Sequence, residues 1–304
     1  MNKRFLGTRL RYDQALGLLL ISPWLIGFVL FKLLPIIASL GLSFTDFYLL
    51  EPDETQFIGL ANYSRMFQDN AVGFLLVATL NTIIRTVPLQ LVASIGLAAL
   101  LNNQRLKAST PARTLFFLPS IIPSVAILFM WIGFTNPDTG WLNRLILEPL
   151  GFSGPDDLYG NAARSLLFTV NSLWSIGPGM LIMLGAMQGI PKDLMESARV
   201  DGAGPVISFF SITLPLITPA IFFSLILNLI TIFGGVVLLD RGNAFSGGSS
   251  PFDGYISYWL FEEWQLGYAA ALAWIFFVMV MIIIVTLFRT SRRWVYYPDR
   301  EELV

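Results

Sequence analysis

Six long apolar runs constrain this chain more than any other feature of its sequence. They cover about 15–37, 72–101, 114–134, 165–188, 212–239 and 266–288. A helix of roughly 20 apolar residues crosses the hydrocarbon core of a bilayer. Of the 304 residues, 55% are apolar and only 13% are charged. This composition is too apolar for a water-soluble domain of this size. We therefore predict an all-α integral membrane protein, with six transmembrane helices in one domain that spans 1–304.

The lysines and arginines predict the orientation of these spans, because basic residues gather on the cytoplasmic side of a membrane. One side would carry Lys3, Arg4, Arg9, Arg11, Arg105, Lys107, Arg113, Lys192, Arg199, Arg289, Arg292, Arg293 and Arg300. The opposite side would carry Arg65, Arg144, Arg164 and Arg241, spread over longer loops. We expect the first side, and with it both termini, to be cytoplasmic.

Several kinds of function are disfavoured by what the sequence lacks. It has no cysteine and no histidine, and the six runs contain no aspartate or glutamate. Intramembrane carboxylates and histidines are the usual carriers of proton or ion coupling, so an ion-driven secondary transporter is disfavoured. No catalytic or metal-ligating constellation is visible, and we expect no enzyme activity on this chain. It also lacks the G-x-x-x-x-G-K-[ST] loop that holds nucleotide phosphates, so any ATPase would be a separate chain.

Two basic residues fall inside the predicted spans. Lys32 is near the outer end of the first span, where its side chain can snorkel to the headgroups. Arg85 lies deeper, in the second span, one turn after Asn81. Because an arginine in lipid is costly, we expect Arg85 to face protein or a wet cavity. A contact between helices and a role in transport both remain open for it.

Uncharged polar residues mark the fourth and fifth spans. They are Asn171, Ser172, Ser175, Ser224, Asn228 and Thr231. The last three recur at i, i+4 and i+7, which places them on one face of a helix. With Trp174 and Phe233 nearby, they suit a neutral ligand that is rich in hydroxyl groups. They would equally suit hydrogen bonds between neighbouring helices, and the residues alone do not decide between these interpretations.

A polar segment, 189–211, interrupts the apolar sequence on the predicted cytoplasmic side. Pro191 fits the first turn of a short helix, and Gly202 and Gly204 allow the tight turn that follows it. A helix of this length is not stable alone in water, so it needs a surface on which to dock. Beyond it, Pro215 and Pro219 should bend the start of the fifth span.

The same segment carries a recognisable spacing. Glu196-Ser197-Ala198 is followed after three residues by Gly202, and after nine more by Ile212-Thr213-Leu214-Pro215. This resembles the E-A-A signature of permease subunits of ATP-binding-cassette importers, with Ser197 as the one departure. Serine is nearly as small as the alanine it replaces.

The resemblance extends over most of the chain and narrows to the carbohydrate-uptake branch, which includes maltose-type and glycerol-phosphate-type permeases. "RTLFFLPSIIPSVA" (113–126), "NPDTGWLNRLI" (136–146) and "GYAAALAW" (267–274) are similar to that branch. One departure is Gly247-Gly248, where the branch often continues with a proline. The resemblance implies the fold of a type I importer permease in a bacterial or archaeal cytoplasmic (inner) membrane.

The resemblance also implies roles and partners. The residues that would couple to an ATPase are Glu196, Ser197, Ala198, Asp201, Gly202 and Ala203. Among the polar span residues, it favours substrate contact for Ser172, Ser175, Ser224, Asn228 and Thr231, and Asn171 joins them as a candidate. The expected partners are a second homologous permease subunit, an ATPase dimer that holds ATP and magnesium, an external solute-binding protein and a carbohydrate. We expect no cofactor on this chain. An ATP-independent facilitator of small polar solutes is the alternative.

Overall fold

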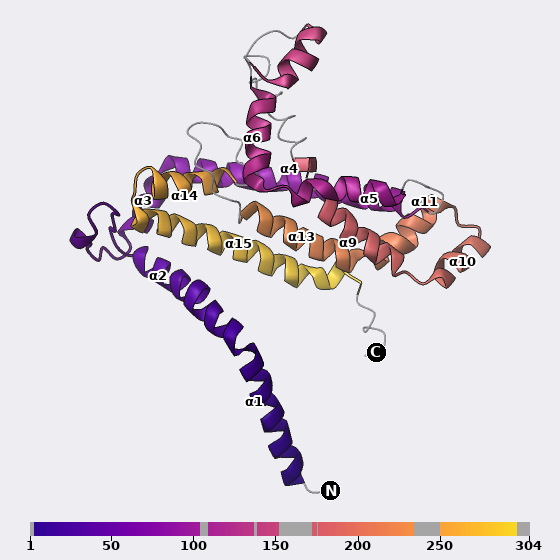
Figure 1. Ribbon diagram of the computed structural model, residues 1–304, viewed down its shortest axis with the longest axis horizontal. Coiled ribbons are helices and arrows are strands. Elements are labelled where there is room, and N and C mark those ends of the chain that lie inside the picture. Colours follow the sequence, from indigo (N-terminus) through magenta and orange to yellow (C-terminus); the bar gives the residue numbers. More distant parts are fainter. Residues whose placement is uncertain are drawn as a thin grey trace. The chain divides into compact units, whose positions relative to one another are not determined.

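The computed structural model describes residues 3–103, 109–136, 139–151, 172–174, 176–233 and 250–296. The chain divides into two compact units. The N-terminal unit comprises Met1–Asn70 and Ile256–Phe277, and the core unit comprises Ala71–Tyr255 and Val278–Val304. Both are built from helices and short connections in their described parts (Figure 1). The prediction of an all-α fold is confirmed.

The N-terminal unit begins with a long apolar helix. It consists of α1 (Lys3–Phe28), η1 (Val29–Leu33) and α2 (Leu34–Leu42), which follow one another without a break. Its apolar part, Leu16–Leu42, is 27 residues long and can cross a membrane. The helix therefore continues beyond the predicted end of the first span at residue 37. A short helix η2 (Pro52–Glu54) and the amphipathic α3 (Ala61–Gln68) follow it.

Arg65 of α3 ties this connection to a distant part of the same unit. Its guanidinium carbon lies 4.5 Å from the ring centroid of Trp259 and 4.2 Å from that of Tyr268. Its Nη1 donates a 2.8 Å hydrogen bond to Oε1 of Gln265. An arginine between two aromatic faces gains cation–π attraction while its edge stays free to donate hydrogen bonds.

The core unit is organised around α4 (Asn70–Leu101), α9 (Gly177–Gln188) and α13 (Thr218–Phe233), together with the later part of α15 (Leu266–Trp294). One buried cluster includes Ala98, Met180, Met183 and Ile217, and a second joins Ile83 and Val87 to Leu229. The described chain also has shorter elements: α5 (Ser109–Phe117), η3 (Leu118–Ile121), α6 (Ser124–Thr135), η4 (Asn143–Leu147), η5 (Glu148–Leu150), α10 (Lys192–Val200), α11 (Pro205–Ser208), η6 (Phe209–Thr213), α12 (Leu214–Leu216) and α14 (Pro251–Phe261).

Three described helices are long and apolar enough to cross a membrane: Leu16–Leu42, Asn70–Leu101 and Leu266–Trp294. A fourth candidate is the bent pair Pro205–Leu216 and Thr218–Thr231, whose halves meet at 64°. The bend falls between Pro215 and Pro219, as the sequence predicts, because proline cannot continue the helical hydrogen-bond ladder.

Besides the bent fifth span, of which residues 234–239 lie outside the described residues, two predicted spans are not single described helices. The run 114–134 is divided between α5, η3 and α6, because Pro119 lies inside η3 and Pro123 precedes α6. Of the run 165–188, residues 165–171 and 175 lie outside the described residues. The total of six spans and the cytoplasmic termini stay predictions.

Candidate functional site

The polar segment forms one short helix, α10 (Lys192–Val200), between α9 and the helices that lead into α13. Pro191 precedes it in an extended conformation and acts as the N-cap residue. Asp193 lies in the first turn and Arg199 in the last. Each charge is therefore placed where the helix dipole favours it.

A Schellman motif ends α10. Gly202 has a φ of +80°, a conformation that costs little only for glycine. Its N–H donates to the carbonyl oxygen of Arg199 at 3.1 Å, and the N–H of Ala203 donates to that of Ala198 at 2.9 Å. This pair of bonds defines the motif and satisfies two carbonyl groups at the helix end. The glycine in the sequence signature is therefore a structural requirement of the turn.

The two faces of α10 differ in burial. Ala198 is only 8% exposed and packs inward, and Met195 lies half-buried beside it. The opposite face is exposed and carries Asp193, Glu196, Ser197 and Val200, of which Val200 is 88% exposed. The exposed face of α10 therefore combines an apolar side chain, Val200, with the carboxylates of Asp193 and Glu196.

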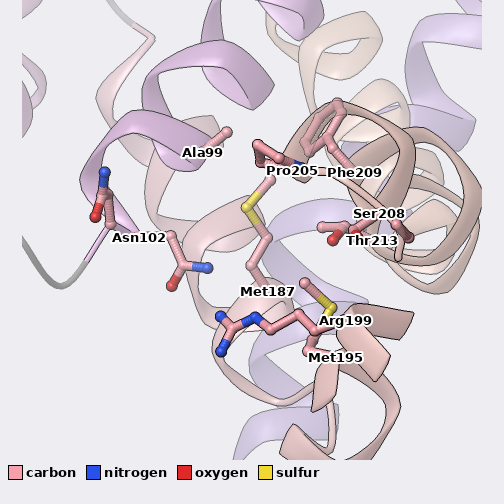
Figure 2. A pocket seen from close by; sticks show the side chains of 11 residues that line it. Ala99, Asn102, Met187, Met195, Arg199, Pro205, Ser208, Phe209 and Thr213 are labelled. Atoms are coloured by element: carbon pink, nitrogen blue, oxygen red, sulfur yellow. The ribbon is translucent and has the colours of Figure 1, made fainter. Parts of the chain in front are cut away.

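A pocket of about 340 Å³ lies behind the inward face of α10 (Figure 2). Its walls come from the ends of α4 and α9, from α10, and from α11 (Pro205–Ser208) and η6 (Phe209–Thr213). Figure 2 shows Arg199 extending from α10 toward the side on which Asn102 lies. The lining residues are Ala99, Asn102, Asn103, Met187, Met195, Arg199, Ala203, Pro205, Ser208, Phe209 and Thr213. Thus α10 does not pack tightly along its whole length against the helices that it joins.

The remaining predicted coupling residues flank these features. Ser197 is exposed on the outer face, and its carbonyl oxygen accepts a 3.0 Å bond from the N–H of Asp201. Asp201 is the exposed C-cap residue, and Ala203 is half-buried in the pocket wall. The structure thus divides the predicted set: Glu196, Ser197 and Asp201 face outward, whereas Ala198 and Ala203 face the protein.

The polar residues of α13 differ in how exposed they are. Ser224 is 1% exposed. Its hydroxyl oxygen would lie 3.4 Å from a Cβ atom placed on Gly179, and that of Ser94 would lie 2.8 Å from it. The missing side chain of Gly179 therefore allows α9 to approach these two serines. Asn228 is half-buried, and Thr231 is exposed and donates to the carbonyl oxygen of Leu227.

Of the candidates in the fourth predicted span, Ser172 is described and half-buried. Its carbonyl oxygen accepts a 2.8 Å hydrogen bond from Nε2 of Gln90 in α4. Trp174 lies nearby, with its ring edge-to-face with that of Trp131 at 6.0 Å between centroids. Asn171 and Ser175 lie outside the described residues.

Sequence reasoning missed two parts of this site: the outward Val200 and the pocket. Val200 follows Glu196 by four residues, so a helical projection of 192–200 would have placed both on one face. Nothing in the sequence could have predicted the pocket, because its walls come from segments that are far apart in the chain.

Long apolar helices and a bent helix pair are typical of an integral membrane protein. Residues 90–294 match the family model for the inner membrane component of binding-protein-dependent transport systems. The chain belongs to this family.

Individual relatives agree with that assignment. A probable ABC transporter permease protein of Bacillus subtilis, YesP, is 39% identical over 96% of both chains. The arabinooligosaccharide transport permease AraP of Halalkalibacterium halodurans is 29% identical over 90% of this chain and 87% of its own length. A solved bacterial ABC transporter involved in alginate import shares the fold, with a TM-score of 0.77 and 23% identity over 95% of this chain and 98% of that chain.

Proposed function

We propose that this chain is the permease subunit of an ATP-driven carbohydrate importer, in which α10 couples transport to a separate ATPase. A second permease subunit, an ATPase dimer that holds ATP and magnesium, and an external solute-binding protein complete the assembly. The six-span topology, with both termini in the cytoplasm of the inner membrane, belongs to the same proposal. This chain holds no cofactor of its own in this scheme.

The exposed face of α10 is the observation that carries the proposal. Glu196 and Val200 lie one turn apart on it, and both are exposed. A short helix that is held at Gly202 by a Schellman motif presents them in a fixed geometry. The matching surface on the ATPase would be a cleft with an apolar wall and basic or amide groups at its rim.

Coupling then requires α10 to transmit movement to the membrane helices. The helix is joined through Gly202 and Ala203 to the bent segment that becomes α13. Closure of the ATPase dimer would push α10, and the rigid turn would carry that displacement into the bend at Ile217. The pocket behind α10 leaves room for such a displacement.

The carbohydrate substrate is supported by the relatives. AraP is named for arabinooligosaccharides, and a permease of Thermococcus litoralis that is 28% identical over 94% of this chain is named for trehalose and maltose. In this chain, Asn228 and Thr231 of α13 retain exposed surface. We assign substrate contact first to these two, and also to Ser172 beside Trp174, because amides and hydroxyls bind sugar hydroxyls and an indole stacks on sugar CH faces. Asn171, Ser175 and the buried Ser224 stay candidates of lower priority.

The experiment compares Glu196→Ala and Gly202→Asp with the parent chain in the complete transporter. Both variants should lose most of the co-purified ATPase or most of the sugar-stimulated ATP hydrolysis. The exposed Asp53→Ala, in η2, serves as a matched removal of a carboxylate far along the sequence. Normal assembly and uptake by both α10 variants would refute the coupling assignment. Sugar flux through liposomes that contain this chain alone would favour the facilitator instead.

A further inference from the structure

The pocket behind α10 contains two buried hydroxyl groups that have no partner among the described residues. Ser208 of α11 and Thr213 of η6 line the pocket and are 5% and 7% exposed. No described residue forms a hydrogen bond with either side chain. By contrast, Thr231 and Thr286 donate to carbonyl oxygens of the preceding turn of their helices. Because a buried hydroxyl group normally has a partner, these two point to a molecule that enters the pocket.

Arg199 places a positive charge at the mouth of the same pocket. It is the only charged residue among the 11 that line the pocket, and it is exposed, as is the neighbouring Asn102. Within the described residues, its guanidinium group forms neither an ion pair nor a hydrogen bond. Glu196 lies one turn before it on α10, but on the outer face, and does not line the pocket. The mouth is therefore suited to an anionic group.

A second guanidinium group lies at the end of α4, close to the lining residues. Nη2 of Arg113 in α5 donates a 3.2 Å hydrogen bond to the carbonyl oxygen of Leu101, which lies between the lining residues Ala99 and Asn102 in the chain. No carboxylate lines the pocket. The local charge is therefore positive, which raises the concentration of anions at the mouth.

The inner part of the pocket has an apolar wall. Met187 is 4% exposed and Phe209 is half-buried, and both line it. In Figure 2, Ser208 and Thr213 lie on the far side of Met187 from Asn102. The volume of about 340 Å³ is in the ordinary range of small-molecule sites. An inorganic anion at the mouth would leave the inner hydroxyl groups and the apolar wall uncovered, so the occupant needs a body as well as a charge.

We propose that this pocket binds a phosphate ester of a polyol. Arg199 holds the phosphate, since a planar guanidinium group matches two phosphate oxygens at once. Ser208 and Thr213 hydrogen-bond to the hydroxyl or ester oxygens of the polyol. The pocket lies at the ends of α4 and α9. A soluble sugar phosphate and the glycerol phosphate headgroup of a lipid share this chemistry. Asn228 and Thr231, which we assign to the transported carbohydrate, do not line the pocket.

Occupation of the pocket has a consequence that rests on the proposed function. In that scheme α10 moves into the space behind it when the ATPase dimer closes. A phosphate ester between α10 and α4 fills this space and opposes the movement. A bound phosphate ester therefore slows ATP hydrolysis by the complete transporter.

The first experiment measures binding to the purified full chain in detergent. Calorimetry with glucose 6-phosphate, and with glucose as the uncharged comparison, tests the soluble source. Native mass spectrometry of retained phosphatidylglycerol tests the lipid source. Whichever of the two phosphate esters binds, Arg199→Gln should weaken its binding at least tenfold, whereas Lys192→Gln, on the same helix outside the pocket, should match the parent.

Three results would overturn the proposed site. The first is a parent chain that binds neither glucose 6-phosphate nor phosphatidylglycerol. The second is binding of glucose as tight as that of glucose 6-phosphate. The third is parental affinity in Arg199→Gln. Ala99→Phe, which fills the pocket from α4, should abolish binding without removing a polar group.

The double variant Ser208→Ala/Thr213→Val tests the inner hydroxyl groups. It should weaken binding several-fold, and the exposed Ser211→Ala should not. Its unfolding temperature without added phosphate ester should equal or exceed that of the parent, because neither hydroxyl group has a partner to lose within the described residues. Parental affinity, or a drop of several degrees in the unfolding temperature, would overturn the assignment of these hydroxyl groups to a bound molecule.

The last experiment separates the site from the proposed function. The phosphate ester that binds should lower ATP hydrolysis by the complete parent transporter several-fold and should have much less effect on the Ser208→Ala/Thr213→Val transporter. Equal inhibition of both would overturn inhibition through this pocket. Binding without any inhibition of the parent would uphold the site and count instead against the movement of α10 in the proposed function.

Discussion

The backbone N–H of Ala203 donates to the carbonyl oxygen of Ala198 at 2.9 Å, across the turn made by Gly202. This bond closes the end of α10 and aligns the helix with the chain that enters the bent span. Because Gly202 has a φ of +80°, a β-carbon at this position is strained. The geometry of the proposed coupling element depends on that glycine.

Substitutions of Gly202 should therefore show whether the turn needs a residue that tolerates a positive φ. Gly202→Ala should destabilise the turn by about 1 kcal/mol and reduce the ATPase activity that transport substrate stimulates. Gly202→Asn should retain more activity, because asparagine tolerates the left-handed conformation. Steady-state ATP hydrolysis of the reconstituted transporter measures both. Equal activity of the alanine variant and the parent would show that the turn is not required.

The contact between α9 and α5 gives a test of packing in the core unit. A Cβ atom on Gly177 would lie 2.9 Å from Cα of Phe117 and would also clash with the carbonyl oxygen of Phe116. Since backbone atoms cannot rotate away, Gly177→Ala should destabilise the protein by about 1–3 kcal/mol. Gly185→Ala, on the same helix with open space around it, is the matched control and should not destabilise. Thermal unfolding in detergent compares them, and the same Tm for both variants would contradict the packing.

Burial of the carboxyl group of Asp253, near the start of α14, raises its pKa from 3.8 to about 6. The carboxylate of Asp253 therefore binds a proton more tightly in the folded state than in the unfolded state. The stabilising effect of the proton is complete below about pH 4 and is lost as the pH rises through about 6. Asp253→Asn should remove this part of the pH dependence, whereas the exposed Asp53→Asn should keep it. Unfolding temperatures between pH 4.5 and 7.5 test the prediction, and parallel profiles for Asp253→Asn and the parent would contradict it.

The pocket behind α10 can be filled from α4. Ala99 lines it, so Ala99→Phe should occupy part of its 340 Å³ and hold α10 away from α4. Sugar-stimulated ATP hydrolysis should fall several-fold if α10 moves into this space during transport. Leu100→Phe enlarges the neighbouring residue, which is 64% exposed, and should have little effect. If the transporter with Ala99→Phe hydrolysed ATP at the parental rate in response to sugar, the pocket would have no part in coupling.

The sequence predicted the helical fold, the place of α10 and the bend near Pro215, because each depends on a local pattern. It did not predict which residues on a helical face are buried and which are exposed. Ser224, Asn228 and Thr231 share a helical face, yet Ser224 is buried beside Gly179 and Thr231 is exposed. Burial depends on neighbouring helices, which periodicity does not identify. The contact between Arg65 and Gln265 spans 200 residues and carried no signal in either local sequence.

Coupling through α10 is tested most directly by finding which face of this helix meets the ATPase. Single cysteines at Val200, on the exposed face, and at Met195, in the pocket wall, would carry a photoactivated thiol-linked cross-linker in the assembled transporter. If the exposed face of α10 meets the ATPase, the ATPase should be captured from position 200 and not from position 195. Capture from position 195 alone, or from neither position in a complex that still hydrolyses ATP in response to sugar, would contradict it.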